Sequence, residues 1–522
     1  MTCRNKVIAL SLLCILYFLF STLDYIRASR STIVQDDNVI IEFDRHRWRN
    51  AVDDFPAQVP IELPDKEPAY EQPQDEQEEI EAIETVAQHR DQLQQQQQQQ
   101  PASDEKYLTF FTHSGFQNQL IQVENGILLA WYLNRTLILP RALLGEAFGW
   151  SFFSKLQLEH TLRDPPEDES VTINDVCSQH AEELAFWNLH CPEPSRFVVM
   201  PFDDIFDLDW AKQHVRIVLR ERSDFEWLED KYGIKRAGEP DRMNGSYVDG
   251  DILFFKGGTR YDWRIFDTPR KNNRLYKYSD SLDIFQLRAR EEKLIHFSSL
   301  FGTGKLPIRR PEHYEFRRML QRSITYKHPA VLALAEQVVN LLGGAGNYVG
   351  LHVRSGDGWF VKALPENVRS IVSQIGRAVE SRQRTPANVV ALDKYRLGLQ
   401  QCLELSKTEN MTIVFMATDA RYPRMNNAFT PLWNQYPCTF TIDDILPADS
   451  HHWQILDAIK DPRTGGNLRK FLLPLVDASV AGRGWFFIGS EGSTFSGYIY
   501  RLYDVFWSDN EKQRLSQEAH GS

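Results

Sequence analysis

Cysteine is scarce in this chain of 522 residues, which has six cysteines and no Cys-x-x-Cys pair. Together with the lack of a histidine-rich stretch, this leaves no indication of a zinc site. Basic residues are also in deficit, because the formal net charge is −12, and no basic face interleaved with aromatic residues is present. We therefore do not expect nucleic acid to be a partner.

The N-terminal region holds an apolar run that could cross a membrane. Residues 7–23 carry no charge, and the run is close to the shortest length for a spanning helix. Arg4 and Lys6 precede it and favour a cytoplasmic N-terminus. We predict a cytoplasmic tail over residues 1–6 and a transmembrane signal anchor over residues 7–23 of a single-pass type II protein. A cleaved signal peptide is the alternative.

The next segment, residues 24–105, is rich in Asp, Glu, Gln and Pro and contains a glutamine run. Such a segment buries too little apolar surface to offset its chain entropy. We predict a disordered acidic and Gln-rich stem that holds a luminal domain away from the bilayer. The whole chain is 42% hydrophobic, which is enough for two sizeable cores.

Cysteines and sequons in the predicted luminal part fit a secretory location. An even number of cysteines suits an oxidising compartment, and pairing within each half of the chain is the simplest of three possible connectivities. We predict a Golgi or endoplasmic reticulum membrane, and the short anchor favours the Golgi. The cysteines are Cys177, Cys191, Cys402 and Cys438, and the Asn-x-Ser/Thr sequons begin at Asn134, Asn244 and Asn410.

Strand-like and helix-like stretches alternate from residue 106 onward. The first unit reads as a strand (YLTFFT), a helix (LIQVENGILLAWYLN) and a second strand (TLILP), which is how a parallel doubly wound sheet begins. RFVVMPF, DILFFK and LIHFSS read as further strands. A helix from Pro329 stops at the glycine cluster 343–347, where a second series starts with YVGLHV. We predict an α/β protein of two Rossmann-like domains facing a cleft, over residues 106–345 and 346–510, with a polar tail over 511–522.

Polar clusters follow four of the predicted strands, at the carboxyl ends where parallel sheets bind ligands. In the last cluster, glycines permit close backbone approach, and Ser493 and Thr494 begin a helix whose first amides would face a phosphate. Arg354 adds a planar cation that binds a phosphate at two points. An ordinary serine N-cap and an Arg354–Asp357 pair are the plain alternatives. The clusters are residues 113–119, 352–357, 418–421 and 489–497.

Four stretches carry a resemblance to a known family. SGFQNQLIQVENGILLAWYLNRTLILP, GLHVRSGDGW, MATDAR and FIGSEGSTFSGYIYR resemble, in this order, the successive motifs of the GDP-fucose protein O-fucosyltransferase family. The resemblance spans roughly residues 107–503, although most of 156–295 matches no motif. It implies a GT-B glycosyltransferase that transfers fucose from GDP-fucose with inversion and without a metal or other cofactor. The acceptor, a protein hydroxyl or a glycan, would bind on the N-terminal side and GDP-fucose on the C-terminal side.

The same resemblance assigns roles to ten residues. Arg354 would be catalytic, holding the β-phosphate and assisting the departure of GDP, and Asn118 would face the reacting centre. His352 and Asp357 would shape the nucleotide side, and Asp419 would contact the guanosine. The remaining substrate-binding residues are Gly115 and Phe116 in the first cluster and Ser493, Thr494 and Phe495, which would clamp the diphosphate and lie near the sugar or base.

The sequence departs from one branch of this family, which has a glutamate in the first cluster. Residues 114–118 contain no carboxylate, so the base that activates the acceptor is open. The leaving phosphate could take the proton, another residue could activate the acceptor, or the class of acceptor could differ. Glu124, on the following helix, is a weak candidate that reads more naturally as an exposed helix residue.

Three alternatives remain on the sequence alone. A metal-dependent A-type glycosyltransferase would hold its metal with an Asp-x-Asp pair, and Asp249 with Asp251, or Asp207 with Asp209, has that form. A fucosyltransferase acting on glycans would share the His-x-Arg motif. A catalytically inactive, membrane-tethered protein that binds a sugar nucleotide or glycan would keep the fold and lose turnover.

Overall fold

In the computed structural model of this chain, the described residues are 104–165, 170–269, 274–356, 358–382 and 397–520. The predicted anchor and the predicted stem up to residue 103 therefore lie outside the described residues. Among the residues that are described, no helix has both the length and the apolar character needed to cross a membrane.

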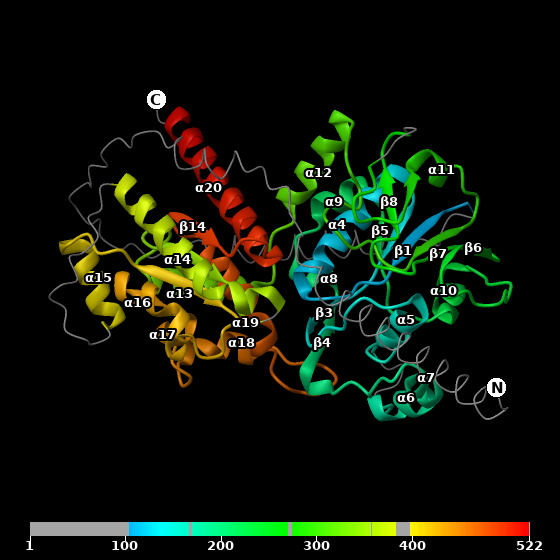
Figure 1. The fold of residues 1–522 in the computed structure, drawn as a ribbon, viewed down its shortest axis with the longest axis horizontal. Coiled ribbons are helices and arrows are strands. Elements are labelled where there is room, and N and C mark those ends of the chain that lie inside the picture. Colours follow the sequence, from blue (N-terminus) through cyan, green and yellow to red (C-terminus); the bar gives the residue numbers. More distant parts are fainter. Residues whose placement is uncertain (1–103, 166–169, 270–273, 357, 383–396, 521–522) are drawn as a thin grey trace, which may run out of the picture.

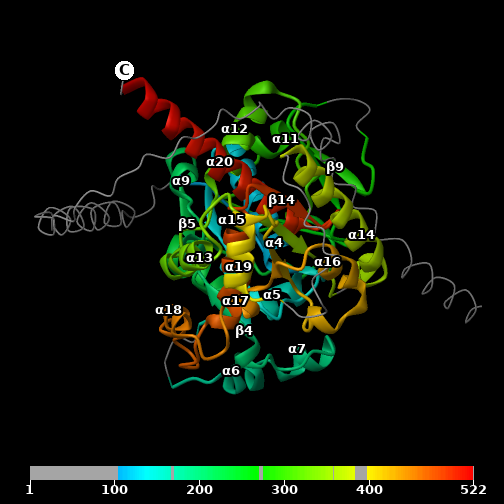
Figure 2. The ribbon, with the colours of Figure 1, turned by 90° about the vertical axis from the view of Figure 1, so that its left-hand side faces the viewer.

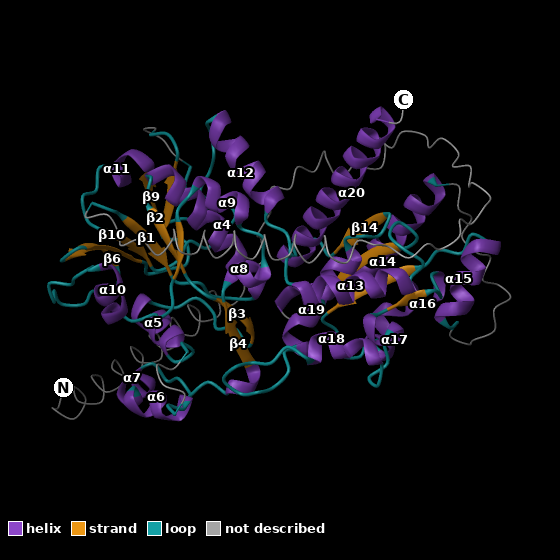
Figure 3. Ribbon diagram, turned by 180° about the vertical axis from the view of Figure 1, so that it is seen from behind, coloured by secondary structure: helices purple, strands orange, loops and turns teal. Residues whose placement is uncertain are grey.

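Each half of the molecule is built on its own parallel sheet with helices around it (Figures 1 and 3). The first sheet has the order β5-β2-β1-β10-β7-β6, in which only β6 is antiparallel to its neighbour. The second has the order β13-β12-β11-β14 and is parallel throughout. The predicted α/β class with two parallel sheets is confirmed. The strands are β1 (Tyr107–Phe110), β2 (Thr136–Leu139), β5 (Ile217–Leu219), β6 (Gly245–Asp249), β7 (Ile252–Lys256), β10 (Leu294–Phe297), β11 (Val349–Val353), β12 (Val414–Thr418), β13 (Thr439–Phe440) and β14 (Phe486–Gly489).

One predicted strand has a different role from the one expected. RFVVMPF forms β4 (Phe197–Met200), which pairs antiparallel with β3 (Ala142–Gly145) in a two-stranded ribbon beside the main sheet. The strand beside β2 is the short β5, which was not predicted from the sequence. The cause is tertiary, since Pro140 ends β2 and the chain turns directly into β3, which then provides the partner for β4. A second ribbon pairs β8 (Trp263–Phe266) with β9 (Asp280–Asp283).

Helices cover both sheets, and the longest predicted ones are present. α4 (Phe116–Leu133) follows β1, and α20 (Thr494–His520) follows β14 and runs outward to the C-terminus in Figure 1. The sequence reading missed α14 (Gly358–Ser381), which directly follows the β11 loop. The other helices of eight or more residues are α5 (Phe153–Thr161), α10 (Phe225–Tyr232), α12 (Pro311–Ser323), α13 (Pro329–Leu341), α15 (Leu399–Thr408) and α19 (Arg469–Ala481). Shorter helices are α6 (Ile173–Gln179), α7 (Ala181–Phe186), α8 (Phe202–Ile205), α9 (Asp209–His214), α11 (Ile284–Arg288), α16 (Thr430–Gln435), α17 (Ile442–Ile445) and α18 (Gln454–Asp457).

The helix α13 precedes the predicted domain boundary at residue 345 but packs with the second half. Its contacts are with α17, α18 and α19, and Figure 2, in which the second half faces the viewer, shows it on that side of the molecule. The two halves also share one apolar cluster. This cluster runs from Leu108 and Phe110 in β1 through α4 and α13 to Phe415 in β12 and Phe487 in β14. The sheets are therefore joined by continuous packing as well as by the chain.

Each half of the molecule contains one disulfide. Cys177 bonds to Cys191 and Cys402 bonds to Cys438. The pairing within each half, which was one of three possibilities from the sequence, is confirmed.

A mostly buried ion pair connects α4 to α20. The Glu124 carboxylate accepts from Arg501 at 2.7 Å and from the Gln321 amide at 3.1 Å. The expectation that Glu124 is an exposed helix residue is wrong, because α20 of the second half packs over it. Both oxygens are engaged, so this carboxylate is not placed to act as a base.

We expect Glu124→Ala to lower the free energy of unfolding by about 3–5 kcal/mol, because it leaves Arg501 mostly buried without its carboxylate. Urea unfolding measures the change. The double variant Glu124→Met/Arg501→Met is the matched control and should recover most of the loss, since an apolar pair of similar size replaces the ion pair. An equally large loss in the double variant would contradict this account.

Candidate active site

Three of the four predicted polar clusters meet at one edge of the second sheet. β11 lies between β12 and β14, with Val353 opposite Thr418 and His352 opposite Gly489. Since all three strands are parallel, their carboxyl ends coincide. The clusters 352–357, 418–421 and 489–497 therefore form one site, as predicted from their positions at strand ends.

Arg354 lies at the centre of this site and is held by Asp419. The guanidinium Nη1 is 2.9 Å from Oδ2 of Asp419, and the Arg354 side chain is 35% exposed, so it is partly open to solvent. The same carboxylate accepts from the Ser355 amide at 2.6 Å, the Ser355 hydroxyl at 2.9 Å and the Gly356 amide at 3.1 Å. Both oxygens of Asp419 are thus used within the protein. These contacts position the Arg354 guanidinium, and the contact of Asp419 with guanosine stays a prediction.

The His352 side chain lies beneath the site. It is buried, its Nδ1 is 2.6 Å from the Ser496 hydroxyl, and the Phe495 ring stands edge-on to it at a centroid distance of 5.0 Å. Burial lowers the pKa of His352 to about 4, and Arg354 adds to the lowering, while Asp419 acts in the opposite direction. The imidazole is therefore neutral at physiological pH, and its hydrogen bond to Ser496 holds the first turn of α20.

The turn between β14 and α20 is shaped by close contacts. Gly492 has φ +77°, a conformation that favours glycine, and a Cβ there would meet the Trp359 ring at 3.4 Å. Gly489 approaches so closely that a Cβ would lie 2.4 Å from that of Ser496. The buried Ser493 hydroxyl accepts from the Ser496 amide at 3.3 Å, as an N-cap does. The amides of Thr494 and Phe495 belong to the first turn, which has no intrahelical acceptors.

The fourth cluster lies at the carboxyl end of β1 in the first sheet. Ser114 has φ +67°, and Gly115 is the exposed N-cap residue of α4. Asn118 lies half-buried in the first turn of that helix, and within the described part of the chain its side-chain amide makes no hydrogen bond. Phe116 stacks on Phe206 at 5.4 Å and so serves packing.

The same Phe206 ring connects this cluster with the second half. It stands edge-on to Tyr498 of α20, with ring centroids 5.8 Å apart, and stacks on Tyr326 at 5.3 Å. One aromatic ring therefore separates Phe116, in the first turn of α4, from the second turn of α20. This contact brings the helix starts of both halves toward the same region. The grouping of Asn118 with Arg354 stays a prediction.

The remaining predicted residues, and two that the sequence reading missed, complete the site. Asp357 lies outside the described residues. Ser490 was not predicted; its hydroxyl accepts from the Arg354 amide at 2.9 Å, and its own amide donates to the His352 carbonyl at 3.0 Å. Ser355 was also missed, although Ser490 directly follows β14 and Ser355 comes two residues after β11, both inside the predicted clusters. Their position in the sequence was the available signal.

Buried histidines make stability dependent on pH. Burial lowers the pKa of His352 to about 4, below the ordinary value of about 6.5, so the unfolded chain binds a proton that the folded protein does not. The contribution of His352 to stability is therefore fully present above about pH 6.5 and is expected to fall as the pH drops from about 6.5 toward 4. Unfolding free energies across this range should fall less steeply in His352→Gln than in the wild type. The exposed His451→Gln is the control, and an unchanged slope in His352→Gln would contradict the assignment.

Three of the four carboxylates of the metal-dependent alternative accept hydrogen bonds within the protein. Asp249 is fully buried, and one of its oxygens accepts from the amides of Ala237, Gly238 and Glu239. Its other oxygen pairs with Arg236 at 2.6 Å. Burial alone would raise the pKa of Asp249, but these hydrogen bonds lower it overall. Asp251 accepts from the Lys235 amide at 2.9 Å, and Asp207 from the Asp209 amide at 2.9 Å.

Among the described residues, no group of three or more His, Cys, Asp or Glu side chains is arranged to hold a metal ion. The Asp249–Asp251 pair is a structural feature of the β6–β7 hairpin.

Two parallel α/β halves, with a glycine-lined turn, a helix N-terminus and an arginine at one strand edge, are typical of enzymes that bind nucleotide phosphates. The model of the GDP-fucose protein O-fucosyltransferase family matches residues 186–506, which is more than half of the chain. The chain therefore belongs to the GDP-fucose protein O-fucosyltransferase family and is a glycosyltransferase. No curated protein matches it.

Solved structures of POFUT1 are among those similar to this chain. The crystal structure of POFUT1 in complex with GDP-fucose has 14% sequence identity and a TM-score of 0.33, covering 78% of this chain and 96% of that chain. POFUT1 in complex with GDP has 14% identity and a TM-score of 0.33, with 77% and 96% covered. The assignment to the family rests on the match of the family model.

Proposed function

We propose that this protein transfers fucose from GDP-fucose, with inversion, to a serine or threonine hydroxyl of a polypeptide. Family membership supports the donor and the reaction class. The observation that carries the proposal is the position of Arg354, which Asp419 orients at the strand edge where α20 begins. A partly open cation and a helix N-terminus at one edge suit a diphosphate.

Arg354 would stabilise the departing GDP. Breaking the bond between fucose and phosphate builds negative charge on the diphosphate and positive charge on the sugar ring. A guanidinium already fixed by Asp419 stabilises the negative charge on the diphosphate without reorganising. Such preorganised groups lower the barrier most effectively. Asp419 would act through Arg354 and is a positioning residue.

The first turn of α20 would bind the remaining phosphate oxygens. The amides of Thr494 and Phe495 have no intrahelical acceptors and carry the positive end of the helix dipole. Gly492 keeps the approach to them open, because any side chain there would be strained and would meet Trp359. Asp357 would shape the nucleotide side.

The acceptor would be bound beside Asn118 on the first half. In the transfer, the C1–O bond to phosphate breaks and a C1–O bond to the acceptor forms from the opposite face. The hydroxyl proton passes to an oxygen of the departing diphosphate. Glu124 does not take this role, because Arg501 and Gln321 engage both of its oxygens.

The membrane arrangement proposed from the sequence completes this function. Residues 7–23 would anchor a type II protein in the Golgi membrane, with residues 24–105 as the stem and the two α/β halves in the lumen. Protease protection of the intact microsomal protein tests the topology. Digestion of the two α/β halves in the absence of detergent would contradict the proposed topology.

Nucleotide release tests the donor. The purified full-length chain is incubated with GDP-fucose, GDP-mannose or UDP-glucose, with and without EDTA, and released GDP or UDP is measured. We expect release from GDP-fucose alone, unaffected by EDTA. A binding titration on the same sample covers slow acceptor-free hydrolysis. Failure both to turn over and to bind GDP-fucose, or an EDTA-sensitive signal with another donor, would overturn the proposal.

A further inference from the structure

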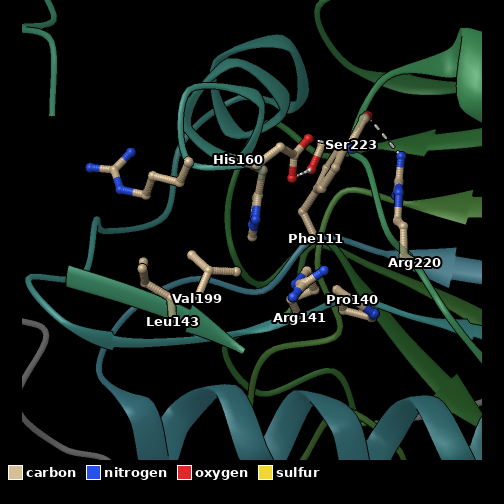
Figure 4. Close-up of a pocket in the computed structure, with 10 residues that line it drawn as sticks. Phe111, Pro140, Arg141, Leu143, His160, Val199, Arg220 and Ser223 are labelled. Carbon is tan, nitrogen blue, oxygen red and sulfur yellow. Dashed lines mark hydrogen bonds between the residues drawn. The ribbon is translucent and has the colours of Figure 1, made fainter. Parts of the chain in front are cut away.

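A polar hollow lies in the first half, at the carboxyl ends of β1, β2 and β5 (Figure 4). Arg141 follows Pro140 after the end of β2, Arg220 directly follows β5, and Arg163 comes two residues after α5. We call this the arginine pocket. The described residues that line it include none of those predicted to bind the donor.

Neutral groups hold one of the three arginines. The buried Arg220 donates to Nε2 of His296 at 3.0 Å and to the carbonyl of Ser223 at 2.9 Å, and its guanidinium lies over the Phe111 ring at 4.8 Å. Asp164, the one carboxylate that lines the pocket, accepts instead from the amide and hydroxyl of Ser223 at 2.6 and 3.0 Å.

The other two arginines of the pocket differ in their direct contacts. Arg163 pairs with the Glu159 carboxylate at 2.6 Å. Arg141, in contrast, makes neither a hydrogen bond nor an ion pair with any described residue. The carboxylates of Asp164, Asp204 and Glu221 act on Arg141 through space. A guanidinium without a direct acceptor in a partly buried hollow favours binding of an anion.

Two guanidinium donors in the pocket lack acceptors. The Nε atoms of Arg141 and Arg163 are buried, and neither has a hydrogen-bond partner in the described part of the chain. Leaving a buried N–H unsatisfied costs stability, so native proteins seldom keep one without a reason. An anion in the pocket would supply the missing acceptor to Arg141.

The pocket borders the cluster that carries Asn118. Gln119, the next residue, donates its side-chain amide to the Leu143 carbonyl at 2.8 Å and accepts from the Leu143 amide at 3.0 Å. His160, on the opposite wall, bonds through Nε2 to the Thr112 carbonyl at 2.7 Å. Burial lowers the pKa of His160 to about 3, so it adds no charge. Whatever occupies the pocket lies beside the first turn of α4.

We propose that the arginine pocket binds a side-chain carboxylate of the polypeptide acceptor, with Arg141 as its main contact. A planar guanidinium meets a carboxylate at two points, which fixes direction as well as position. The pocket would therefore select serine or threonine residues that have an aspartate or glutamate nearby. This inference rests on the proposed function.

Thermal unfolding of the full-length chain with small probes tests the pocket. The probes are N-acetyl-glutamic acid α-amide, which carries one side-chain carboxylate, and its neutral isostere N-acetyl-glutamine amide, at equal ionic strength. We expect the acid to raise the unfolding midpoint saturably and the amide to leave it unchanged. Arg141→Gln should weaken the response to the acid at least tenfold, and Arg354→Gln should keep it.

Controls make each outcome decisive. Arg141→Gln removes no hydrogen bond, so the unfolding midpoint of this variant without probe should not fall. If that midpoint does fall, Arg141→Lys, which keeps the charge, replaces Arg141→Gln in the comparison. Equal responses to acid and amide, or an unchanged response in Arg141→Gln, would overturn the proposal. The proposal would also be overturned if sulfate bound more tightly than the acid probe and Arg141→Gln abolished that binding, since the pocket would then hold a free oxyanion. A GDP-fucose titration of the wild type judges the proposed function separately.

Discussion

Replacing Arg354 with alanine is expected to reduce fucose transfer from GDP-fucose by about 10³-fold, the loss typical of removing a preorganised charge from a developing anion. Arg354 is held by Asp419 at the strand edge beside the start of α20, where the leaving diphosphate would gain charge. The fold should be kept, because Asp419 retains its bonds to Ser355 and Gly356. GDP release under saturating donor measures the effect, and circular dichroism checks the fold.

Two further variants separate charge from geometry. Arg354→Lys keeps the positive charge without the planar fork, so activity should recover only in part. Arg369→Ala, on the adjacent helix α14, removes an exposed arginine paired with Glu366 and should change activity less than twofold. If Arg354→Ala kept more than a tenth of wild-type activity at full donor saturation, Arg354 would be only a partner of Asp419.

The largest effect on stability is expected from Gly350→Ala. Gly350 lies in the middle of β11, and a Cβ there would be 1.9 Å from the backbone carbonyl oxygen of Ala481. The neighbouring chain at Gly484 approaches the same point, where its own Cβ would be 2.4 Å from the Gly350 amide nitrogen. Backbone on both sides cannot move away as a flexible side chain does. We expect a loss of more than about 4 kcal/mol in unfolding free energy, since the strand must shift.

A second glycine in the same half provides the matched control. Gly376 lies inside α14, and a Cβ there would meet the Tyr436 hydroxyl at an ordinary 3.5 Å. Gly376→Ala should stabilise the protein by roughly 0.5–1 kcal/mol through its higher helix propensity. Urea unfolding of both variants gives the comparison. Similar values for the two would show that the packing between β11 and Ala481 can relax.

Local patterns predicted the parallel strands and the donor edge well. Apolar runs bounded by glycine, proline or polar residues are sufficient to mark β1, β2, β11, β12 and β14, and parallel strands place their carboxyl ends together. The grouping of Arg354 with the 489–497 turn follows from that rule alone. What the rule does not give is which groups pair across the edge, so the bond between Asp419 and Arg354 was missed.

The elements that the sequence did not reveal depend on contacts between distant segments. β4 has the composition of a sheet strand, yet β3 supplies its partner in a separate ribbon. Glu124 has the local sequence of an exposed helix residue, yet α20 buries it. The arginine pocket joins residues from three strand ends and the end of α5, so no single motif contains it.

The apolar cluster that runs from β1 to β14 limits how far the molecule can open. A hinge motion that exposed about 400 Å² of this surface to water would cost about 10 kcal/mol, at about 25 cal/mol per Å². So wide an excursion would be populated too rarely to support turnover. Loading of both substrates would then depend on the rearrangement of surface segments around a fixed frame. Neither half, made alone, would be expected to remain in solution as a folded unit.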